Sequence, residues 1–323
     1  MLDRYGRVIN YLRISVTDRC NLRCCYCMPE GVQDVGMKNI LTFEEIWEIV
    51  RTGVSLGITH IRVTGGEPLV RKGCVDLIRG IGEIPGVETI TMTTNGVLLE
   101  NYAKQLKEAG VDGVNISLDT LDPEEFYKIT GKRELQEVLA GIRAAKTAGL
   151  PVKLNAVNRK ELDPIPLVRY AQEENLPLRF IEMMPVGYGK KYVGRSNEEL
   201  RETLEAVCGK AECMTNREEL SRMGSGPAVY YQFTDLKVPV GFISAIHGKF
   251  CDTCNRVRLT AEGYLKLCLC YDEGEDLRRV LREGEKENLR TIMEQTIFRK
   301  PAAHCFEHPD EMTETHEMVK IGG

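Results

Sequence analysis

The sequence lacks any apolar run of the roughly 20 residues that a membrane-spanning helix requires. Its first ten residues contain no apolar signal-peptide core, and no internal repeat or low-complexity segment stands out. A formal net charge of −5 gives no general attraction for nucleic acid. We therefore expect a cytoplasmic protein with no membrane partner and no nucleic-acid partner. The 323 residues suffice for one large α/β barrel with an appendage, or for two domains.

Cysteine, by contrast, is abundant, with 12 residues, and a reducing compartment keeps such thiols free for metals or catalysis. Cys20, Cys24 and Cys27 have the spacing C-x3-C-x2-C and directly follow an apolar, strand-like segment. A [4Fe–4S] cluster normally takes four cysteines, so three would leave one iron open to a ligand. With Tyr26 before the last cysteine, the loop resembles that of radical S-adenosylmethionine (SAM) enzymes. The alternatives are a zinc knot, a disulfide pair and a buried thiol cluster.

A second triplet, Cys251, Cys254 and Cys268, has the spacing C-x2-C-x13-C. His247 lies four residues before it, so spacing alone leaves a Cys3His zinc site as an alternative to a second cluster. Arg256 and Arg258 would project from one side of an extended segment, which suits a phosphate or another anion; the alternative is a solvated charged loop. We interpret the other six as ordinary thiols: Cys25, Cys74, Cys208, Cys213, Cys270 and Cys305.

Strand-like and helix-like segments alternate from residue 11 to about 183, which predicts βαβ units and a parallel sheet. The predicted strands are 12–16, 60–64, 89–93, 113–117, 152–157 and 178–182. One predicted helix begins at Thr42, where Glu45 completes a capping box, and others cover 71–82, 97–109, 134–148 and 163–174. Beyond Met184 we expect a loop, a helix-like region at 196–222 and short strands at 228–233 and 240–245.

Most of these strands have one polar face, although buried parallel strands are usually apolar throughout. Side chains alternate with period two, so the polar residues of each strand share a face. These residues are Arg13 and Ser15; His60, Arg62 and Thr64; Thr91 and Thr93; Asn115 and Ser117; Lys153 and Asn155. Because a closed eight-stranded barrel has an apolar interior, a polar one indicates a wet cavity for a charged ligand. The alternative is amphipathic strands that face solvent.

Three short motifs fall at the ends of predicted strands, where ligands bind in α/β folds. They are Gly65-Gly66-Glu67-Pro68, Thr94-Asn95-Gly96 and Ser117-Leu118-Asp119. The glycines of the first would let a ligand approach the backbone closely. The sequence ends in Gly322-Gly323, which by itself predicts only a frayed terminus.

Taken together, these features resemble the GTP 3′,8-cyclase family, radical SAM enzymes of molybdenum cofactor biosynthesis. The resemblance rests on DRCNLRCCYCMP, TGGEPL, TTNG, SLD, RFIEMMPVG, CDTCNRVRLTAEGYLKLCL and the terminal IGG. It implies an incomplete (β/α)6 TIM-like barrel in residues 1–222 and a cluster-bearing extension in 223–323. It also implies two [4Fe–4S] clusters, each with three cysteine ligands. A 5′-deoxyadenosyl radical from SAM would remove the ribose 3′ hydrogen of GTP, giving (8S)-3′,8-cyclo-7,8-dihydroguanosine 5′-triphosphate.

The same resemblance implies the site residues. The metal ligands are Cys20, Cys24, Cys27, Cys251, Cys254 and Cys268, and the SAM contacts are Tyr26, Gly66, Ser117 and Met184. The GTP contacts are Arg13, Arg62, Thr93, Lys153, Arg256, Val257 and Arg258, and the catalytic group is Arg13, Arg256, Arg258, Gly322 and Gly323. The sequence departs from the family pattern at His60, where relatives often carry lysine, and at Cys25.

The implied partners are GTP, a low-potential electron donor such as flavodoxin or ferredoxin, a downstream cyclic pyranopterin monophosphate synthase, and a second copy of the chain in a homodimer. Two other hypotheses stay open. A radical SAM peptide-modifying enzyme would act on a peptide and would not need a cationic cavity. An iron–sulfur electron carrier would ligate each cluster with four cysteines, whereas both triplets here have three.

Overall fold

The computed structural model describes residues 1–31, 35–192, 194–224, 226–284 and 286–321. All strands in this part of the chain join one sheet. The first half contains β1 (Tyr11–Ser15), α1 (Phe43–Ser55), β2 (His60–Thr64), α2 (Cys74–Gly82), β3 (Thr89–Thr94), α3 (Leu99–Glu108), β4 (Gly113–Ser117), α4 (Pro123–Thr130), α5 (Leu135–Thr147), β5 (Val152–Asn158), α6 (Ile165–Glu173) and β6 (Leu178–Glu182). The second half contains α7 (Asn197–Cys208), β7 (Ala211–Cys213), α8 (Arg217–Arg222), β8 (Val229–Phe233), β9 (Val240–Ile243), β10 (Arg256–Leu259), β11 (Tyr264–Lys266), β12 (Gly274–Asp276), α9 (Leu277–Arg282) and α10 (Leu289–Phe298).

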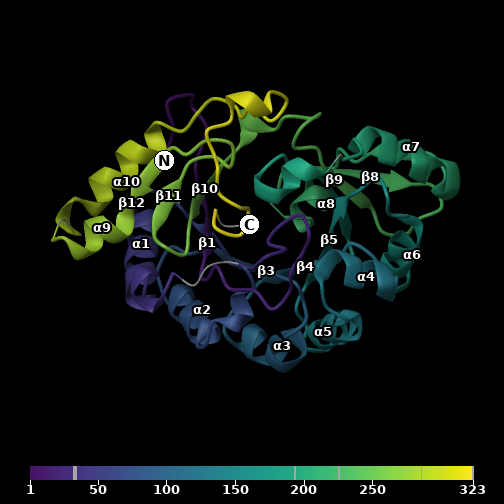
Figure 1. The fold of residues 1–323 in the computed structure, drawn as a ribbon, viewed down its shortest axis with the longest axis horizontal. Coiled ribbons are helices and arrows are strands. Elements are labelled where there is room, and N and C mark those ends of the chain that lie inside the picture. Colours follow the sequence, from purple (N-terminus) through teal and green to yellow (C-terminus); the bar gives the residue numbers. More distant parts are fainter. Residues whose placement is uncertain (32–34, 193, 225, 285, 322–323) are drawn as a thin grey trace.

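The sheet is an open barrel with the order β12-β11-β10-β1-β2-β3-β4-β5-β6-β9-β8-β7. Strands β1 to β6 are parallel neighbours in sequence order, as expected from six βα units. The second half adds one parallel strand at each side, β10 beside β1 and β9 beside β6. Helices α1 to α6 lie outside the curved sheet, and the C-terminal segment runs into its middle (Figure 1). The predicted incomplete barrel with a C-terminal extension is confirmed.

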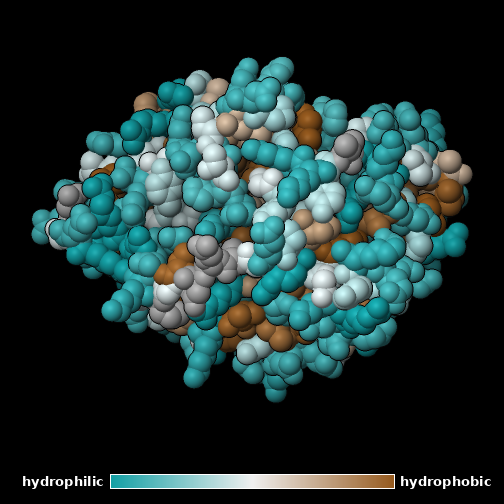
Figure 2. All heavy atoms as spheres, in the orientation of Figure 1, coloured by the Kyte–Doolittle hydropathy of each residue, from teal (hydrophilic) through white to brown (hydrophobic). Residues whose placement is uncertain are grey.

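The apolar face of the strands packs against the surrounding helices and forms the main hydrophobic core with them. Ile14, Val63, Met92, Ile116 and Leu154 are fully buried there, at 0% exposure, as their alternation with polar residues predicts. The capping box at Thr42 is also confirmed, since both of its hydrogen bonds to Glu45 are present. No described helix is long and apolar enough to cross a bilayer, and most of the surface in Figure 2 is hydrophilic.

Two elements differ from the sequence-based expectation. The helix-like region 196–222 is interrupted, because Gly209, with a φ of 77°, follows α7 and the chain then pairs as β7 with β8. Helix α4 was not predicted, although Asp122 caps it and Pro123 occupies its first turn. The segment expected to be extended around Arg256 is a strand, β10.

Candidate active site

The polar faces of the strands line a cavity of about 310 Å³, within the usual range of small-molecule sites, about 300–1,000 Å³. Arg62, Arg13 and Arg258 lie side by side in it, because Arg13 is in register with Arg62 on β2 and with Arg258 on β10. Thr93, Ser117 and Asn155 line the same cavity from β3, β4 and β5. As predicted, this face lines an interior cavity, and the alternative of strands that face solvent is wrong.

The arginines give the cavity a concentrated positive charge. Burial, followed by the charges of Arg258 and Arg62, holds the pKa of Arg13 well below its usual range. Burial and the neighbouring Arg256 lower the pKa of Arg258 to about 10. Buried Arg13 Nε, Arg256 Nε and Thr93 Oγ1 have no hydrogen-bond partner among the described residues. A bound anion would satisfy such donors and offset the repulsion between the guanidinium groups.

Arg179 on β6 is a further lining residue that the sequence analysis missed. Its guanidinium donates hydrogen bonds to Asn155 Oδ1, at 2.9 Å, and to Asn115 Oδ1. Burial lowers the pKa of Arg179, with Arg62 adding to the effect. The signal was present in the sequence, since Arg179 stands between the apolar Leu178 and Phe180 in a predicted strand.

The first cysteine loop closes the other side of the cavity, where Cys20, Cys24 and Cys27 line the wall. The loop rests on the end of α4, through hydrogen bonds from Arg23 N to Thr130 O (2.7 Å) and from Cys25 N to Ile129 O (2.8 Å). Burial raises the pKa of Cys20 to about 11 and that of Cys27 to about 12. Because metal ligation requires thiolates, cluster binding to this loop would release protons.

The turn after β2 fits closely against this loop. A Cβ atom on Gly66 would lie 2.4 Å from Arg19 O, so only glycine is accommodated there. Gly66 N donates to Thr17 O at 2.7 Å, and Glu67 N donates to Arg19 O at 2.8 Å. The buried Glu67 carboxylate in turn accepts hydrogen bonds from Asn95 N (2.7 Å) and Thr94 Oγ1 (2.9 Å). Hydrogen bonds thus join the turns after β2 and β3 to each other, and the turn after β2 to the backbone that leads into the cysteine loop.

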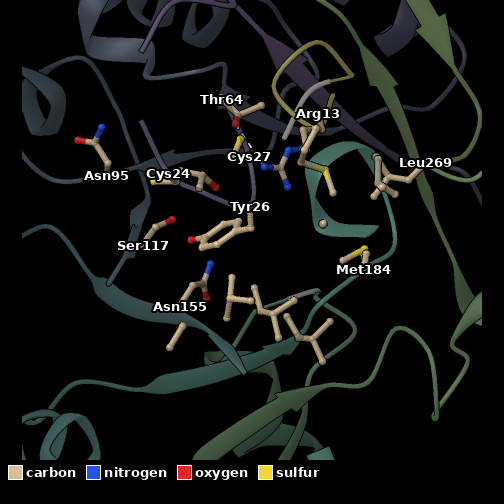
Figure 3. Close-up of a pocket in the computed structure, with 18 of the residues that line it drawn as sticks. Arg13, Cys24, Tyr26, Cys27, Thr64, Asn95, Ser117, Asn155, Met184 and Leu269 are labelled. Carbon is tan, nitrogen blue, oxygen red and sulfur yellow. Dashed lines mark hydrogen bonds between the residues drawn. The ribbon is translucent and has the colours of Figure 1, made fainter. Parts of the chain in front are cut away.

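Tyr26 and Met184 both point into the cavity, and Ser117 lines it from the end of β4 (Figure 3). The Tyr26 hydroxyl donates to Asp119 Oδ2 at 2.7 Å, and Asp119 Oδ1 accepts from Val157 N at 2.8 Å. Gly66 lines the same wall. The four residues expected to contact SAM are therefore gathered in one place beside the first cysteine triplet.

The second triplet does not line this cavity itself, but its neighbours Arg256, Arg258 and Leu269 do. Burial opposes ionisation of Cys254, but Lys300 and Arg256 outweigh it and lower the pKa of that thiol. A tetrahedral zinc site with Zn–S bonds near 2.3 Å needs sulfur atoms roughly 3.8 Å apart. Among the described residues, neither cysteine triplet has all three sulfurs within 4.8 Å of one another.

His247, the possible fourth ligand of a zinc site, contacts Glu182 instead. Its side chain is 60% exposed, and Nδ1 lies 3.0 Å from Glu182 Oε1. Glu182 also accepts hydrogen bonds from Ile246 N and His247 N, at 2.7 and 3.1 Å. The histidine therefore helps Glu182 to hold the loop that follows β9.

Two of the expected GTP contacts, Val257 and Lys153, do not line the cavity, and neither does His60. The Val257 side chain is fully buried in the hydrophobic core, so only its backbone is available. Lys153 donates to Met223 O at 2.7 Å, and its pKa is lowered to about 8 by burial and by Arg179 and Arg62. His60 Nδ1 is 2.8 Å from Thr59 Oγ1 and does not line the cavity.

The C-terminal segment reaches the first cysteine loop. Met318 lines the cavity together with Cys27, and the backbone N–H of Val319 partly offsets the effect of burial on the pKa of the Cys27 thiol. Ile321 is buried at 2% exposure. Gly322 and Gly323, which the sequence analysis placed in the catalytic group, lie outside the described residues.

Comparison with known proteins agrees with this architecture. Residues 14–164 match the model of the Radical SAM superfamily, and residues 176–306 match that of Molybdenum Cofactor Synthesis C. SuiB of Streptococcus suis, solved bound to S-adenosylmethionine, is similar in fold with a TM-score of 0.65 over 97% of this chain and 77% of that chain, at 14% identity.

Curated relatives match at full length. The chain is 42% identical to GTP 3′,8-cyclase from Clostridium perfringens and 43% identical to that from Petrotoga mobilis, with 100% of each chain covered. It is 44% identical to the same enzyme from Thermodesulfovibrio yellowstonii, again over 100% of both chains. This chain therefore belongs to the GTP 3′,8-cyclase family of radical SAM enzymes.

Proposed function

We propose that this protein converts GTP to (8S)-3′,8-cyclo-7,8-dihydroguanosine 5′-triphosphate in molybdenum cofactor biosynthesis. The observation that carries the proposal is the arginine row, in which Arg62, Arg13 and Arg258 lie in register across three strands and face the first cysteine triplet over one cavity. A triphosphate is the type of anion that such a row would bind. The full-length relatedness to GTP 3′,8-cyclases identifies the nucleotide.

Membership of the radical SAM superfamily implies a [4Fe–4S] cluster and SAM. When bound, these cofactors supply the organic radical that starts the reaction. We assign the cluster to Cys20, Cys24 and Cys27, whose three sulfurs leave one iron open. We assign SAM to Tyr26, Gly66, Ser117 and Met184, which gather beside those sulfurs. Asp119 would fix the Tyr26 ring through its hydrogen bond to the hydroxyl.

For GTP, we assign the triphosphate to Arg13, Arg62, Lys153, Arg256 and Arg258. The orphaned donors on Arg13 and Arg256 support this assignment, because a phosphate oxygen would complete their hydrogen bonding. Thr93, with an orphaned hydroxyl, and the backbone of Val257 are further contacts, and Arg179 joins the set on geometry. The role of these residues is to hold the ribose near the radical source and to exclude water.

We further propose a second [4Fe–4S] cluster on Cys251, Cys254 and Cys268. The cationic surroundings of Cys254 support it, because Lys300 and Arg256 favour the thiolate that binds a metal. With three ligands, this cluster also keeps an open iron, which could hold the guanine base. In this scheme the catalytic group is Arg13, Arg256, Arg258, Gly322 and Gly323.

The resemblance also supports a division of labour along the chain and a cellular setting. We propose that residues 1–222 form the radical SAM unit and 223–323 the unit that bears the second cluster. A cytoplasmic location would keep the thiols reduced. A low-potential electron donor such as flavodoxin or ferredoxin, a cyclic pyranopterin monophosphate synthase that takes the product, and a homodimer complete the proposed assembly.

The experiment is an anaerobic incubation of the iron-reconstituted protein with SAM, dithionite and GTP, following 5′-deoxyadenosine and GTP together. We expect the two to change in step, and Cys24→Ser to abolish SAM cleavage. Release of 5′-deoxyadenosine while GTP survives would contradict the substrate assignment and would favour another substrate class, such as a peptide. Unchanged SAM cleavage by Cys24→Ser would contradict the assignment of the first cluster.

A further inference from the structure

The arginine row continues by one more cation, on β11. Lys266 pairs with Arg258 across the antiparallel β10–β11 ladder, and directly opposed residues share a face of the sheet. Lys266, Arg258, Arg13 and Arg62 therefore occupy one row over four neighbouring strands. Unlike the arginines, Lys266 does not line the cavity, and its side chain is only 2% exposed.

A carboxylate from the C-terminal segment neutralises this last cation. Lys266 Nζ donates to Glu314 Oε2 and to Tyr271 O, the latter at 3.0 Å. The Glu314 side chain is fully buried, and its other oxygen accepts from His316 N at 2.7 Å. Both charges are thus removed from water and matched to each other, and the second carboxylate oxygen is hydrogen-bonded to His316, which helps to offset the cost of burying the pair.

The same cluster is not a metal site. Ligand atoms of Asp272, Glu314 and His316 lie within 4.8 Å of one another, a spacing that could hold an ion. However, the Lys266 ammonium lies among them, bonded to Glu314 and 3.8 Å from Asp272 Oδ1. It already supplies the positive charge that a metal would bring.

From Glu314 the chain runs to the first cysteine loop in a few residues. Asp272 N donates to Thr313 Oγ1 at 2.9 Å, and Glu314 N donates to Cys270 O at 3.2 Å, which ties the segment to the second cysteine region. Farther along, a Cβ atom on Gly187 would lie 2.8 Å from Glu317 Cα, so the segment passes tightly over that glycine. Met318 then lines the cavity together with Cys27.

We propose that the Lys266–Glu314 ion pair is the anchor that positions residues 313–321 between the two cysteine regions. Glu314 and Lys266 are positioning residues, since neither lines the substrate cavity. Lys266 lies on β11, in the arginine row of the sheet. The ion pair therefore fixes the C-terminal segment relative to the strands that would bind substrate. The contact itself does not depend on the proposed function, but its expected effect on catalysis does.

The test measures hydrogen–deuterium exchange of the anaerobically reconstituted protein, resolved to the peptide that covers 313–321. In Glu314→Gln we expect exchange in this peptide to become faster on the order of tenfold, because the segment then opens locally, while peptides of β1 to β6 stay unchanged. Glu45→Gln, which disrupts the exposed pair with Arg282, is the matched control and should leave the C-terminal peptide unchanged. Unaltered exchange of residues 313–321 in folded Glu314→Gln would overturn the proposal.

A second variant covers the case in which Glu314→Gln does not fold. Replacing both partners, Lys266→Met with Glu314→Met, removes the charges together and preserves packing volume, which buried pairs often tolerate. The anchor predicts faster exchange of 313–321 in this variant as well, and protection equal to wild type would overturn it. Lys266→Arg, with Glu314 retained, keeps the ion pair and should therefore keep most of the wild-type protection of residues 313–321. Loss of that protection would show that charge pairing is not the cause.

Activity gives an independent readout. If the anchored segment positions the first cysteine loop for GTP chemistry, Glu314→Gln should raise the ratio of 5′-deoxyadenosine to cyclised product several-fold. A loosened segment with an unchanged ratio would overturn this catalytic role while the anchor itself stands. If the wild-type protein leaves GTP intact, the proposed function fails, and the exchange experiment still decides the anchor.

Discussion

Among individual residues, the arginines of the cavity share one physical constraint: each lies close to another positive charge. Arg256 illustrates it, with an orphaned Nε and a guanidinium 5.3 Å from the ring of Phe250. This arrangement holds the group in place but leaves its hydrogen-bonding capacity for a ligand.

Arg256→Ala should therefore leave SAM cleavage measurable but reduce cyclised product at least about tenfold, since one charge-assisted hydrogen bond contributes roughly 1.5–3 kcal/mol. The measurement is 5′-deoxyadenosine and product from the same anaerobic reaction. Arg290→Ala, an arginine 56% exposed on α10, is the control and should match wild type. Full product formation by Arg256→Ala would remove Arg256 from the substrate site.

Lys153 predicts a pH dependence. Its pKa is lowered to about 8 by burial and by the charges of Arg179 and Arg62, so the free protein carries this cation below that pH and loses it above. An anion binds the protonated form better, so GTP affinity should fall as pH rises from about 7 to about 9. Binding measured anaerobically across this range tests it. Lys153→Arg should flatten the profile, because arginine stays charged; an equally steep profile would assign the titration elsewhere.

Among the elements, the packing of α5 against the turn after β3 leaves no room for a larger side chain. A Cβ atom on Gly141 would lie 2.3 Å from Gly96 O, in the Thr94-Asn95-Gly96 turn whose backbone is also held by Glu67. The helix thus sets the position of a strand end that borders the first cysteine loop.

Gly141→Ala should lower the free energy of unfolding by about 1–3 kcal/mol, the usual cost of overpacking, and should weaken SAM binding by displacing the turn. Denaturant unfolding and SAM binding to the reconstituted protein measure the two effects. Gly82→Ala is the matched helical control, because its added Cβ would meet nothing nearer than 3.5 Å. If both variants behave alike, the close approach at Gly96 is not what positions the turn.

At the scale of the whole molecule, one sheet brings the first cysteine triplet and the arginines beside the second triplet to the same cavity. The first precedes β2, and the second is adjacent to β10, which returns to pair with β1. Because the two triplets come from separate segments of the chain, the two metal centres should assemble independently.

Cys268→Ser should therefore reduce reconstituted iron from roughly eight to roughly four atoms per chain and still allow SAM cleavage. Iron and zinc analysis together with 5′-deoxyadenosine release measures this. Cys213→Ser, which removes an exposed thiol, is the control and should retain the full iron content. One zinc and only about four irons in the wild type would mean that the second triplet holds zinc.

The sequence alone determined the local features of this protein. The alternation of strand-like and helix-like segments predicted all six strands of the barrel, and period-two alternation predicted the polar face of five of them, because burial on one side requires it. The spacing of Cys20, Cys24 and Cys27 and the Gly-Gly turn predicted the first site, since local spacing limits which atoms can meet.

Only the tertiary structure decided which of these features meet. The pairing of Arg13 with Arg258 joins strands far apart in the chain, and no local pattern sets that register. The same pairing turns Val257 into the core and brings Lys266 within reach of Glu314. These long-range contacts depend on which edge of the sheet each strand of the second half pairs with. The packing of the whole sheet, and not any local sequence pattern, determines that pairing.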